Sequence, residues 1–386
     1  MGPTQPYLVE KALDAQLEYA NGAAQVDPAV ERKVLRKIDL ILTPVFWLTY
    51  LDRANVGNAK VAGLEADLGL VGYQYNICLT VFYIFYASFE MGSNAVCKLI
   101  SPRWWIPIQI VAFGSVCLAT GFVHNYAGFI VARVFLGIAE AGVLPAMALV
   151  LSRFYKRDEL VLRVGLLVSA ACLAGGFGGL LASGFIAAGN LVGSPWRNIF
   201  LLEGAMTIGL GFVIACFSAG SPQDAWWLSP EEKEIAINRL KRPFSTTPRQ
   251  AQNGTRQVLR YLATPTPWIC AFGYLASNVT VQGVSLFSPT IIRALYPGMT
   301  TVQIQLRSVP PYAVAFAWAI FVAWLSAKIN RRGVLLLFSI PFAIAGYAIF
   351  VGTGQDAPNA RYAGVFLNIL GGKPSFYQLY IHRVFL

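Results

Sequence analysis

Six ionisable residues lie within long apolar segments of this sequence or at their edges. They are Asp52, Arg53, Glu90, Arg133, Glu140 and Glu203. A charge at the centre of a membrane-spanning helix costs about 2.5–3.5 kcal/mol on insertion scales, so it persists only where it faces a protein interior or a water-filled cavity. The set therefore predicts a polar pathway through an apolar bundle. For any single member, a charge at a helix end can instead reach the aqueous interface.

The stretch TYLDRANVGNAK (49–60) ends the first apolar run with an acid directly followed by a base. Side chains of adjacent helical residues diverge by about 100°, so Asp52 and Arg53 cannot both face one partner helix. One interpretation directs Arg53 into a substrate cavity and Asp52 toward another span, with Asn55 on the face of Asp52. The alternative is that this stretch already forms the outer mouth of the first span.

A second pair of charges lies in RVFLGIAEAGVLP (133–145). Seven residues place Arg133 and Glu140 on one helix face, about 10.5 Å apart along the axis. That separation is too long for a direct bond, so either both line one cavity or each pairs with another helix. Gly137, Gly142 and Pro145 allow close packing and a kink in the same segment.

Two further spans carry small or polar residues at helical spacing. A stripe of small residues, which lets another helix approach closely, is formed by Ala171, Gly175, Gly179 and Ser183. The GGFGG within it is no phosphate loop, because it lies in an apolar span and no P-loop lysine follows. Asn278 and Gln282 share a face four residues apart, and they either line a cavity or hydrogen-bond between helices.

The composition is that of a polytopic membrane protein. Of the 386 residues, 56% are hydrophobic and 13% charged, against about 25% charged in soluble chains. Residues 1–37 contain no apolar core of a cleavable signal peptide, so the first span is expected to direct insertion. Apolar windows of about twenty residues predict spans near 38–57, 76–97, 104–123, 127–151, 162–188, 197–217, 267–292, 309–328 and 333–352, with a tenth beginning near 360.

The basic residues are distributed unevenly between the two sides that these spans define. Most of the 30 lysines and arginines fall on the side of the N-terminus. The opposite side receives Lys60, Arg197, Arg293, Arg307 and Arg361. The positive-inside rule therefore predicts a cytoplasmic N-terminus and a multi-pass protein, expected at the plasma membrane. It also explains the net charge of +11 without a nucleic-acid partner.

A polar, basic segment separates the first six spans from those that follow, as between two packed six-helix halves. Within it, Ser229 and Glu232 form a capping box with Pro230 at the first helical position, which predicts a surface helix. The expected units are a cytoplasmic tail (1–37), an N-terminal six-helix bundle (38–217), a cytoplasmic linker containing an amphipathic helix (218–265), an incomplete C-terminal bundle (266–372) and an atypical tail (373–386).

These motifs resemble the major facilitator superfamily, and within it the anion:cation symporter family in the fungal branch of allantoate, nicotinate, pantothenate and biotin permeases. The resemblance rests on LDRANVGNAK, FEMGSNAVCKLISPRWWIP (89–107), RVFLGIAEAGVLPAMALVLSRFY (133–155) and WRNIFLLEG (196–204). It implies an all-α polytopic fold with a complete N-terminal half. Because the family has twelve spans and ten are visible, it also implies an incomplete C-terminal half. The family's Pro-Ser-Asn in the second span is Gly92-Ser93-Asn94 here.

The resemblance also implies roles for the charged residues. Asp52 and Glu140 match the family's proton carriers, and Arg53 matches the arginine that attracts the substrate carboxylate. Further candidates for substrate binding are Asn55, Arg133, Asn278 and Gln282. Structural or gating roles are expected for Glu90, Asn94, Gly137, Gly142, Pro145, Gly175, Gly179 and Glu203.

The expected function is proton-coupled symport of a small organic anion by alternating access, performed by a monomer in the lipid bilayer without a cofactor. A chain with a truncated second half could instead act as a non-transporting ligand sensor or regulatory fragment. An enzyme is not expected, because His124 and His382 lie far apart and the six cysteines form no CxxC or zinc spacing. No metal site is therefore predicted.

Overall fold

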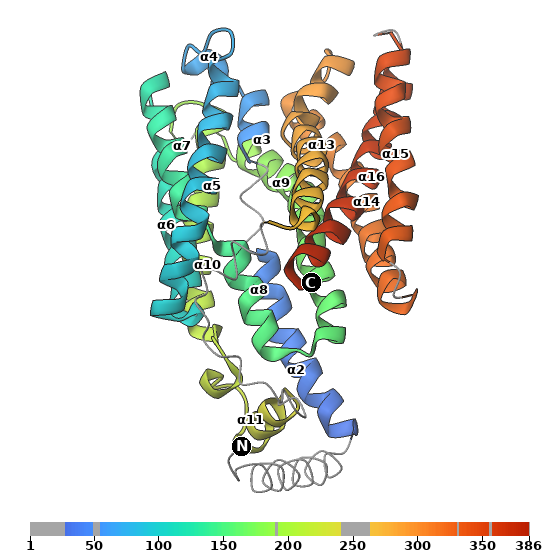
Figure 1. Ribbon diagram of the computed structural model, residues 1–386. Coiled ribbons are helices and arrows are strands. Elements are labelled where there is room, and N and C mark those ends of the chain that lie inside the picture. Colours follow the sequence, from blue (N-terminus) through green and yellow to red (C-terminus); the bar gives the residue numbers. More distant parts are fainter. Residues whose placement is uncertain are drawn as a thin grey trace, which may run out of the picture.

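The computed structural model of the chain is a bundle of helices (Figure 1). It describes residues 28–48, 55–189, 192–240, 263–329, 332–354 and 357–385, and every regular element in these ranges is helical. Asp52 and Arg53 lie outside the described residues. The polar pair of the first span therefore enters the argument through its sequence alone.

Each predicted span that the structure describes contains a helix. The fourth span consists of two helices, and the described parts of the first span contain α2 and α3. The bounds are α2 (Pro28–Leu48), α3 (Asn55–Val61), α5 (Gln74–Ile100), α6 (Pro102–Thr120), α7 (Tyr126–Glu140), α8 (Val143–Phe154), α9 (Arg157–Ala187), α10 (Pro195–Phe217), α13 (Pro265–Leu295), α14 (Thr301–Ile329), α15 (Arg332–Gly352) and α16 (Pro358–Phe385).

Short helices lie between the spans. These are α4 (Leu64–Asp67), η2 (Pro222–Asp224) and α11 (Pro230–Asn238). The predicted capping box is present at α11, because the Glu232 N–H donates to Ser229 Oγ at 3.2 Å and the Ser229 N–H donates to Glu232 Oε2 at 2.9 Å. The predicted linker helix is therefore confirmed.

The structure differs from the sequence prediction in the fourth span, which is broken rather than kinked, because α7 ends at Glu140 and α8 begins at Val143. The helix α16 extends through residues 373–385, the segment expected to form the atypical tail.

The helices form two groups joined along a seam (Figure 1). The helices α5, α6, α7 and α10 lie on one side, and α13 to α16 lie on the other. The helix α9 packs along α14, and α3 packs on α13. Glycines permit both contacts: a Cβ on Gly175 would lie 2.5 Å from the Tyr312 ring, and one on Gly57 would lie 2.5 Å from the Leu286 carbonyl oxygen. Gly175 and Gly179 of the predicted small-residue stripe thus face α14.

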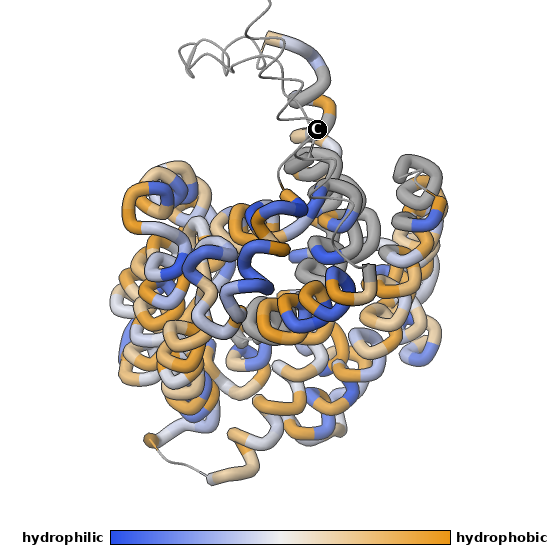
Figure 2. Tube along the Cα trace, turned by 90° about the horizontal axis from the view of Figure 1, so that it is seen from below, coloured by the Kyte–Doolittle hydropathy of each residue, from blue (hydrophilic) through white to orange (hydrophobic). Residues whose placement is uncertain are grey.

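The outer surface of the bundle is apolar. Figure 2 shows hydrophobic residues along the helices on both sides of the molecule. Large exposed side chains include Met91 on α5, Phe272 on α13 and Val351 on α15. Two segments of the described residues, 126–154 and 195–217, combine the length and apolar composition needed to cross a membrane. A surface of this kind is typical of a bundle surrounded by lipid.

Candidate functional site

Arg133 and Glu140 are both buried on the inner face of α7. Their exposed fractions are 5% and 9%. The helix is capped by Asn125, whose side chain accepts the Gly128 N–H at 2.8 Å, and it ends at Glu140 itself. Seven residues are close to two helical turns, so the two side chains share a face that points into the bundle.

The Arg133 guanidinium lies between two aromatic rings. Its central carbon is 4.6 Å from the centre of the Phe129 ring and 5.5 Å from that of Phe200 on α10. Its Nε and one terminal nitrogen are buried and donate no hydrogen bond to the described residues. A desolvated guanidinium that is held by rings and keeps two donors is suited to a planar anion such as a carboxylate.

The helices around this pair approach closely. A Cβ on Gly137 would lie 2.6 Å from the Phe82 carbonyl oxygen, so α7 rests directly on α5. Gly142 has φ 88°, which glycine adopts without strain, and a Cβ there would lie 3.6 Å from Asn94 Oδ1. These glycines bring the second span against the fourth, beside Glu140.

The other predicted site residues fall into three sets. Glu90 and Asn94 are half-buried on α5, and Glu203 is 3% exposed on α10, so these lie in the half that contains Arg133. Asn278 and Gln282 are half-buried on α13, in the other half. Pro145 lies in the first turn of α8. Gly175 and Gly179 contact α14. Asn55 is the first residue of α3, and its side chain is outside the described residues.

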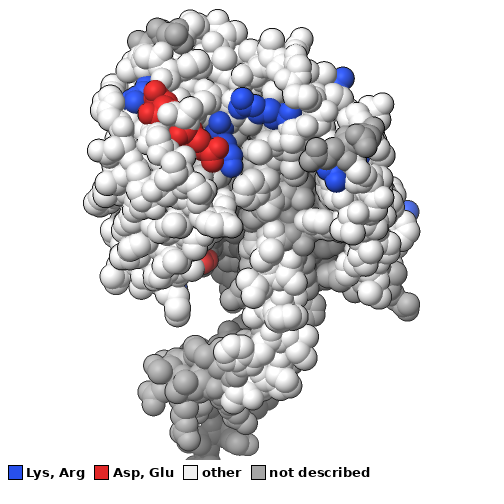
Figure 3. Space-filling model, turned by 90° about the horizontal axis from the view of Figure 1, so that it is seen from above, with Lys and Arg blue, Asp and Glu red and all other residues white. Residues whose placement is uncertain are grey.

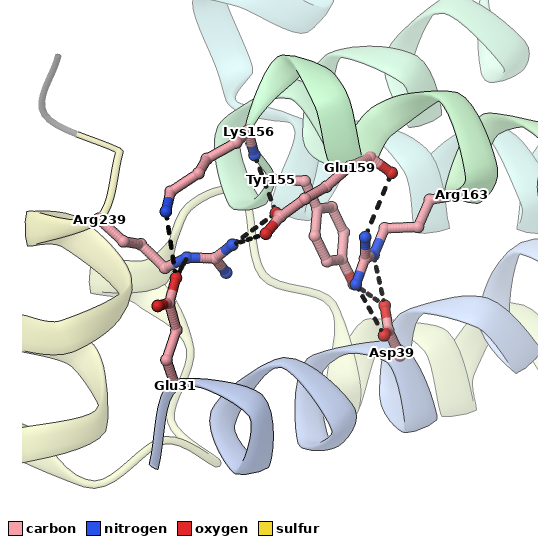
Figure 4. Close-up of polar contacts among 7 residues, drawn as sticks. All are labelled: Glu31, Asp39, Tyr155, Lys156, Glu159, Arg163 and Arg239. Atoms are coloured by element: carbon pink, nitrogen blue, oxygen red, sulfur yellow. Dashed lines mark hydrogen bonds and ion pairs between the residues drawn. The ribbon is translucent and has the colours of Figure 1, made fainter. Parts of the chain in front are cut away.

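A cluster of charges that the sequence did not indicate lies where α2, α9 and the residue after α11 meet (Figure 4). Glu31 of α2 accepts from Lys156 at 3.2 Å and from Arg239 at 3.1 Å. Arg239, which follows α11, also pairs with Glu159 of α9. The linker helix is thereby attached to the N-terminal half. The only available signal was the high density of charges in these segments, which is also usual on solvated surfaces.

The helix α2 is bound to its neighbours by further polar contacts in the same cluster. Asp39 accepts from Arg163 at 2.7 and 3.0 Å and from the Tyr155 hydroxyl at 2.7 Å. Lys37 also donates to Glu232 at 2.6 Å. The helix α2, which leads toward Asp52, is therefore fixed to α9 and α11 at one end.

Charged side chains also gather at the opposite end of the bundle (Figure 3). Lys60 pairs with Glu65 at 3.1 Å. Asp67 accepts from Trp196 Nε1 at 2.8 Å and from Arg197 at 3.3 Å. Burial would raise the pKa of the Asp67 carboxyl, but hydrogen bonds from Trp196 and Ser194 and the charge of Arg197 outweigh it, so the pKa lies below its ordinary 3.8.

Hydrogen bonds between described residues of the two halves are present at this same end. Arg293 of α13 donates to the Val61 carbonyl at 3.1 Å, and Gln305 of α14 donates to the Asn58 carbonyl at 3.1 Å. Both carbonyls belong to α3. Together with the close approach of Gly57 to Leu286, they join the halves at the end predicted to face outward.

Comparisons with known proteins agree with this architecture. The family model of the Major Facilitator Superfamily matches residues 42–378. The high-affinity nicotinic acid transporter of Saccharomyces cerevisiae is 33% identical over 369 residues, covering 94% of this chain and 67% of that protein. The MFS transporter prlL of a fungal species (strain NRRL 50135) is 32% identical over 377 residues, covering 96% of this chain and 74% of that protein.

Solved structures share the fold at lower identity. A bacterial homologue of the human lysosomal transporter Spinster, inward-facing and unoccupied, has a TM-score of 0.63 and 18% identity, covering 92% of this chain and 76% of that one. The proton:xylose symporter XylE bound to 6-bromo-6-deoxy-D-glucose has a TM-score of 0.64 and 14% identity, covering 90% and 81%. This likeness shows the fold alone.

The helical bundle with its two groups and buried charges is that of a multi-pass membrane transporter of small molecules. The chain belongs to the major facilitator superfamily. Its relatives are transporters rather than enzymes.

Proposed function

We propose that the chain is a proton-coupled symporter that carries a small organic anion, such as nicotinate, allantoate, pantothenate or a related carboxylate, across the plasma membrane. The observation that carries this proposal is the buried Arg133, whose guanidinium keeps two nitrogen donors free of hydrogen bonds to the described residues. A buried charge of this kind is costly unless it binds an opposite charge. An anionic substrate supplies that charge.

The relatives support the substrate class. The yeast relative, 33% identical to this chain, is a nicotinic acid transporter, and nicotinate is a planar monoanion with one carboxylate. Arg53 supplies a second guanidinium in the first span. A Lys at either position would keep the charge but lose the planar pair of donors that matches a carboxylate.

The acids supply the coupling. Outside the cell, Asp52 and Glu140 take up protons, which leaves Arg53 free to bind the substrate carboxylate. On the inside, loss of the protons restores competition for the arginine and expels the substrate. Each pH unit of gradient contributes about 1.36 kcal/mol per proton. If both acids carry a proton with one monoanion, one positive charge crosses per cycle, which contributes about 2.3 kcal/mol per 100 mV.

Alternating access supplies the conformational change. The contacts of α3 with α13, including the Arg293 and Gln305 hydrogen bonds, close the end predicted to face outward. Opening this end requires those contacts to break while the halves rock against each other. In this proposal a monomer with a cytoplasmic N-terminus performs the cycle.

An uptake screen tests the proposal. Cells lacking their own carriers would express the chain and receive radiolabelled nicotinate, allantoate, pantothenate, biotin or a short peptide at two external pH values. The proposal predicts saturable uptake of one of the carboxylates, faster at acidic pH and abolished by a protonophore. Saturable binding to purified protein without uptake would indicate the sensor alternative instead.

A further inference from the structure

The fourth span is interrupted immediately after Glu140 (Figure 1). Ala141 leaves the helix with ψ 125°, and Gly142 has φ 88° before α8 begins at Val143. A side chain at position 142 would be strained at this φ and would also collide with Ser93 Oγ of α5. The break is therefore set by the sequence and by its contact with the second span.

The break leaves a backbone acceptor without a donor from its own segment. In a continuous helix, the N–H of residue 145 would donate to the carbonyl of residue 141. Residue 145 is proline, which has no N–H. Ala141 is fully buried, and a buried carbonyl without a donor is destabilising.

A side chain from the third span supplies the donor. Gln109 of α6 is 4% exposed, and its Nε2 donates to the Ala141 carbonyl and, at 2.9 Å, to Ser93 Oγ. Ser93 Oγ also accepts from Trp105 Nε1 at 3.1 Å. These groups, here called the Gln109 bracket, comprise Gln109, Ser93, Trp105 and the Ala141 carbonyl. They tie the second and third spans to the break in the fourth.

We propose that the Gln109 bracket positions Glu140 for proton transfer. Glu140 is the residue next to the bracketed carbonyl, so the geometry of the break decides where the last turn of α7 ends and where the carboxyl points. Broken helices are a common place for coupling ions in transporters. The inference rests on the proposed function, because it takes Glu140 as a proton carrier. Gln109 itself is a positioning residue.

Hydrogen exchange in lipid nanodiscs tests whether the bracket holds the break. Gln109→Leu removes the donor and should raise amide exchange in peptides from residues 138–146 at least fivefold. Gln109→Glu keeps the size and should raise it as much at a pH where the new carboxyl is ionised and has no proton to donate. Ser115→Ala is the matched control on α6, because among the described residues the Ser115 hydroxyl is exposed and donates to the Val111 carbonyl of the same helix. Unchanged exchange in both Gln109 variants would overturn the bracket.

Transport of radiolabelled nicotinate in proteoliposomes tests the positioning role. Gln109→Leu should lower accumulation driven by a pH gradient at least fivefold and leave substrate counterflow at equal pH within twofold. A purely structural defect would lower both together. Gln109→Glu should recover toward wild type at acidic pH, because its protonated carboxyl can again donate. Equal loss of accumulation and counterflow would overturn the positioning role.

The two measurements separate this inference from the proposed function. If wild-type accumulation proves independent of the pH gradient, the proposed function fails and the positioning role fails with it. Hydrogen exchange would still decide whether the bracket exists. If accumulation depends on the gradient but Gln109→Leu matches Ser115→Ala in both transport assays, the proposed function stands and the positioning role is overturned.

Discussion

At the scale of single residues, the site depends on charges that an apolar bundle tolerates only when they are compensated. Arg133 is compensated by the faces of two rings, which leave part of its guanidinium open to an anion. Glu140 ends a helix at a break held by Gln109. The sequence indicated both charges because they interrupt an apolar run. It did not indicate Gln109, a single amide whose partner is a backbone carbonyl in another span.

Substitution of the buried arginine tests the binding site. Arg133→Lys should weaken nicotinate binding about tenfold, because an ammonium lacks the planar pair of donors, while expression and membrane delivery stay near wild type. Scintillation proximity binding to purified protein measures the affinity. Arg103, which stacks on Trp104 (52% exposed) at the end of α6, is the control: Arg103→Lys should bind as wild type. Wild-type affinity in Arg133→Lys would remove this guanidinium from the site.

The Asp67 carboxyl, which lies outside the spans, is expected to make the stability of the fold depend on pH. Its folded pKa lies below the ordinary 3.8, so the ionised group stabilises the fold above that value and the contribution is lost as pH falls through the folded pKa. Asp67→Asn should therefore unfold at a lower temperature than wild type at pH 7 and at pH 5, and the two midpoints should converge only as the pH falls through the folded pKa of Asp67. Convergence already at pH 5 would contradict the assignment.

At the scale of elements, the positions of the helices followed from the sequence because apolar windows are long and their ends carry charges or Pro. The break in the fourth span could not be predicted from the sequence, because Gly and Pro in a span are compatible with both a kink and a break. Its selection depends on Ser93 and Gln109, which are close to it only in the folded bundle. The linker helix could be predicted from local capping alone, whereas its ion pairs with α2 could not.

The contact of α9 with α14 predicts opposite effects for two glycines of one helix. Gly175→Ala should destabilise the protein, because its Cβ would lie 2.5 Å from the buried Tyr312 ring. Gly184→Ala should stabilise it slightly, because nothing lies within 4 Å of that Cβ and Ala favours a helix over Gly by about 1 kcal/mol. Thermal unfolding in detergent measures both. A stabilising Gly175→Ala would show that the seam is looser than described.

At the scale of the whole molecule, the charged residues at the two ends of the bundle make different kinds of contact. One end attaches the linker to α2 and α9 through Glu31 and Arg239, and the other joins the two halves through α3. The charge bias predicts that the first end is cytoplasmic. Protease added to sealed right-side-out vesicles should therefore leave the segment 218–265 uncut, and cleavage there would reverse the topology.

Accumulation of substrate in proteoliposomes tests whether the two acids couple transport to protons. Wild-type protein should concentrate radiolabelled nicotinate when the interior is alkaline, and a protonophore should abolish this. Asp52→Asn and Glu140→Gln should lose accumulation yet keep counterflow exchange, because a neutral side chain mimics the protonated state but cannot release a proton. Accumulation that ignores the pH gradient, or that survives at wild-type level in both variants, would contradict the account.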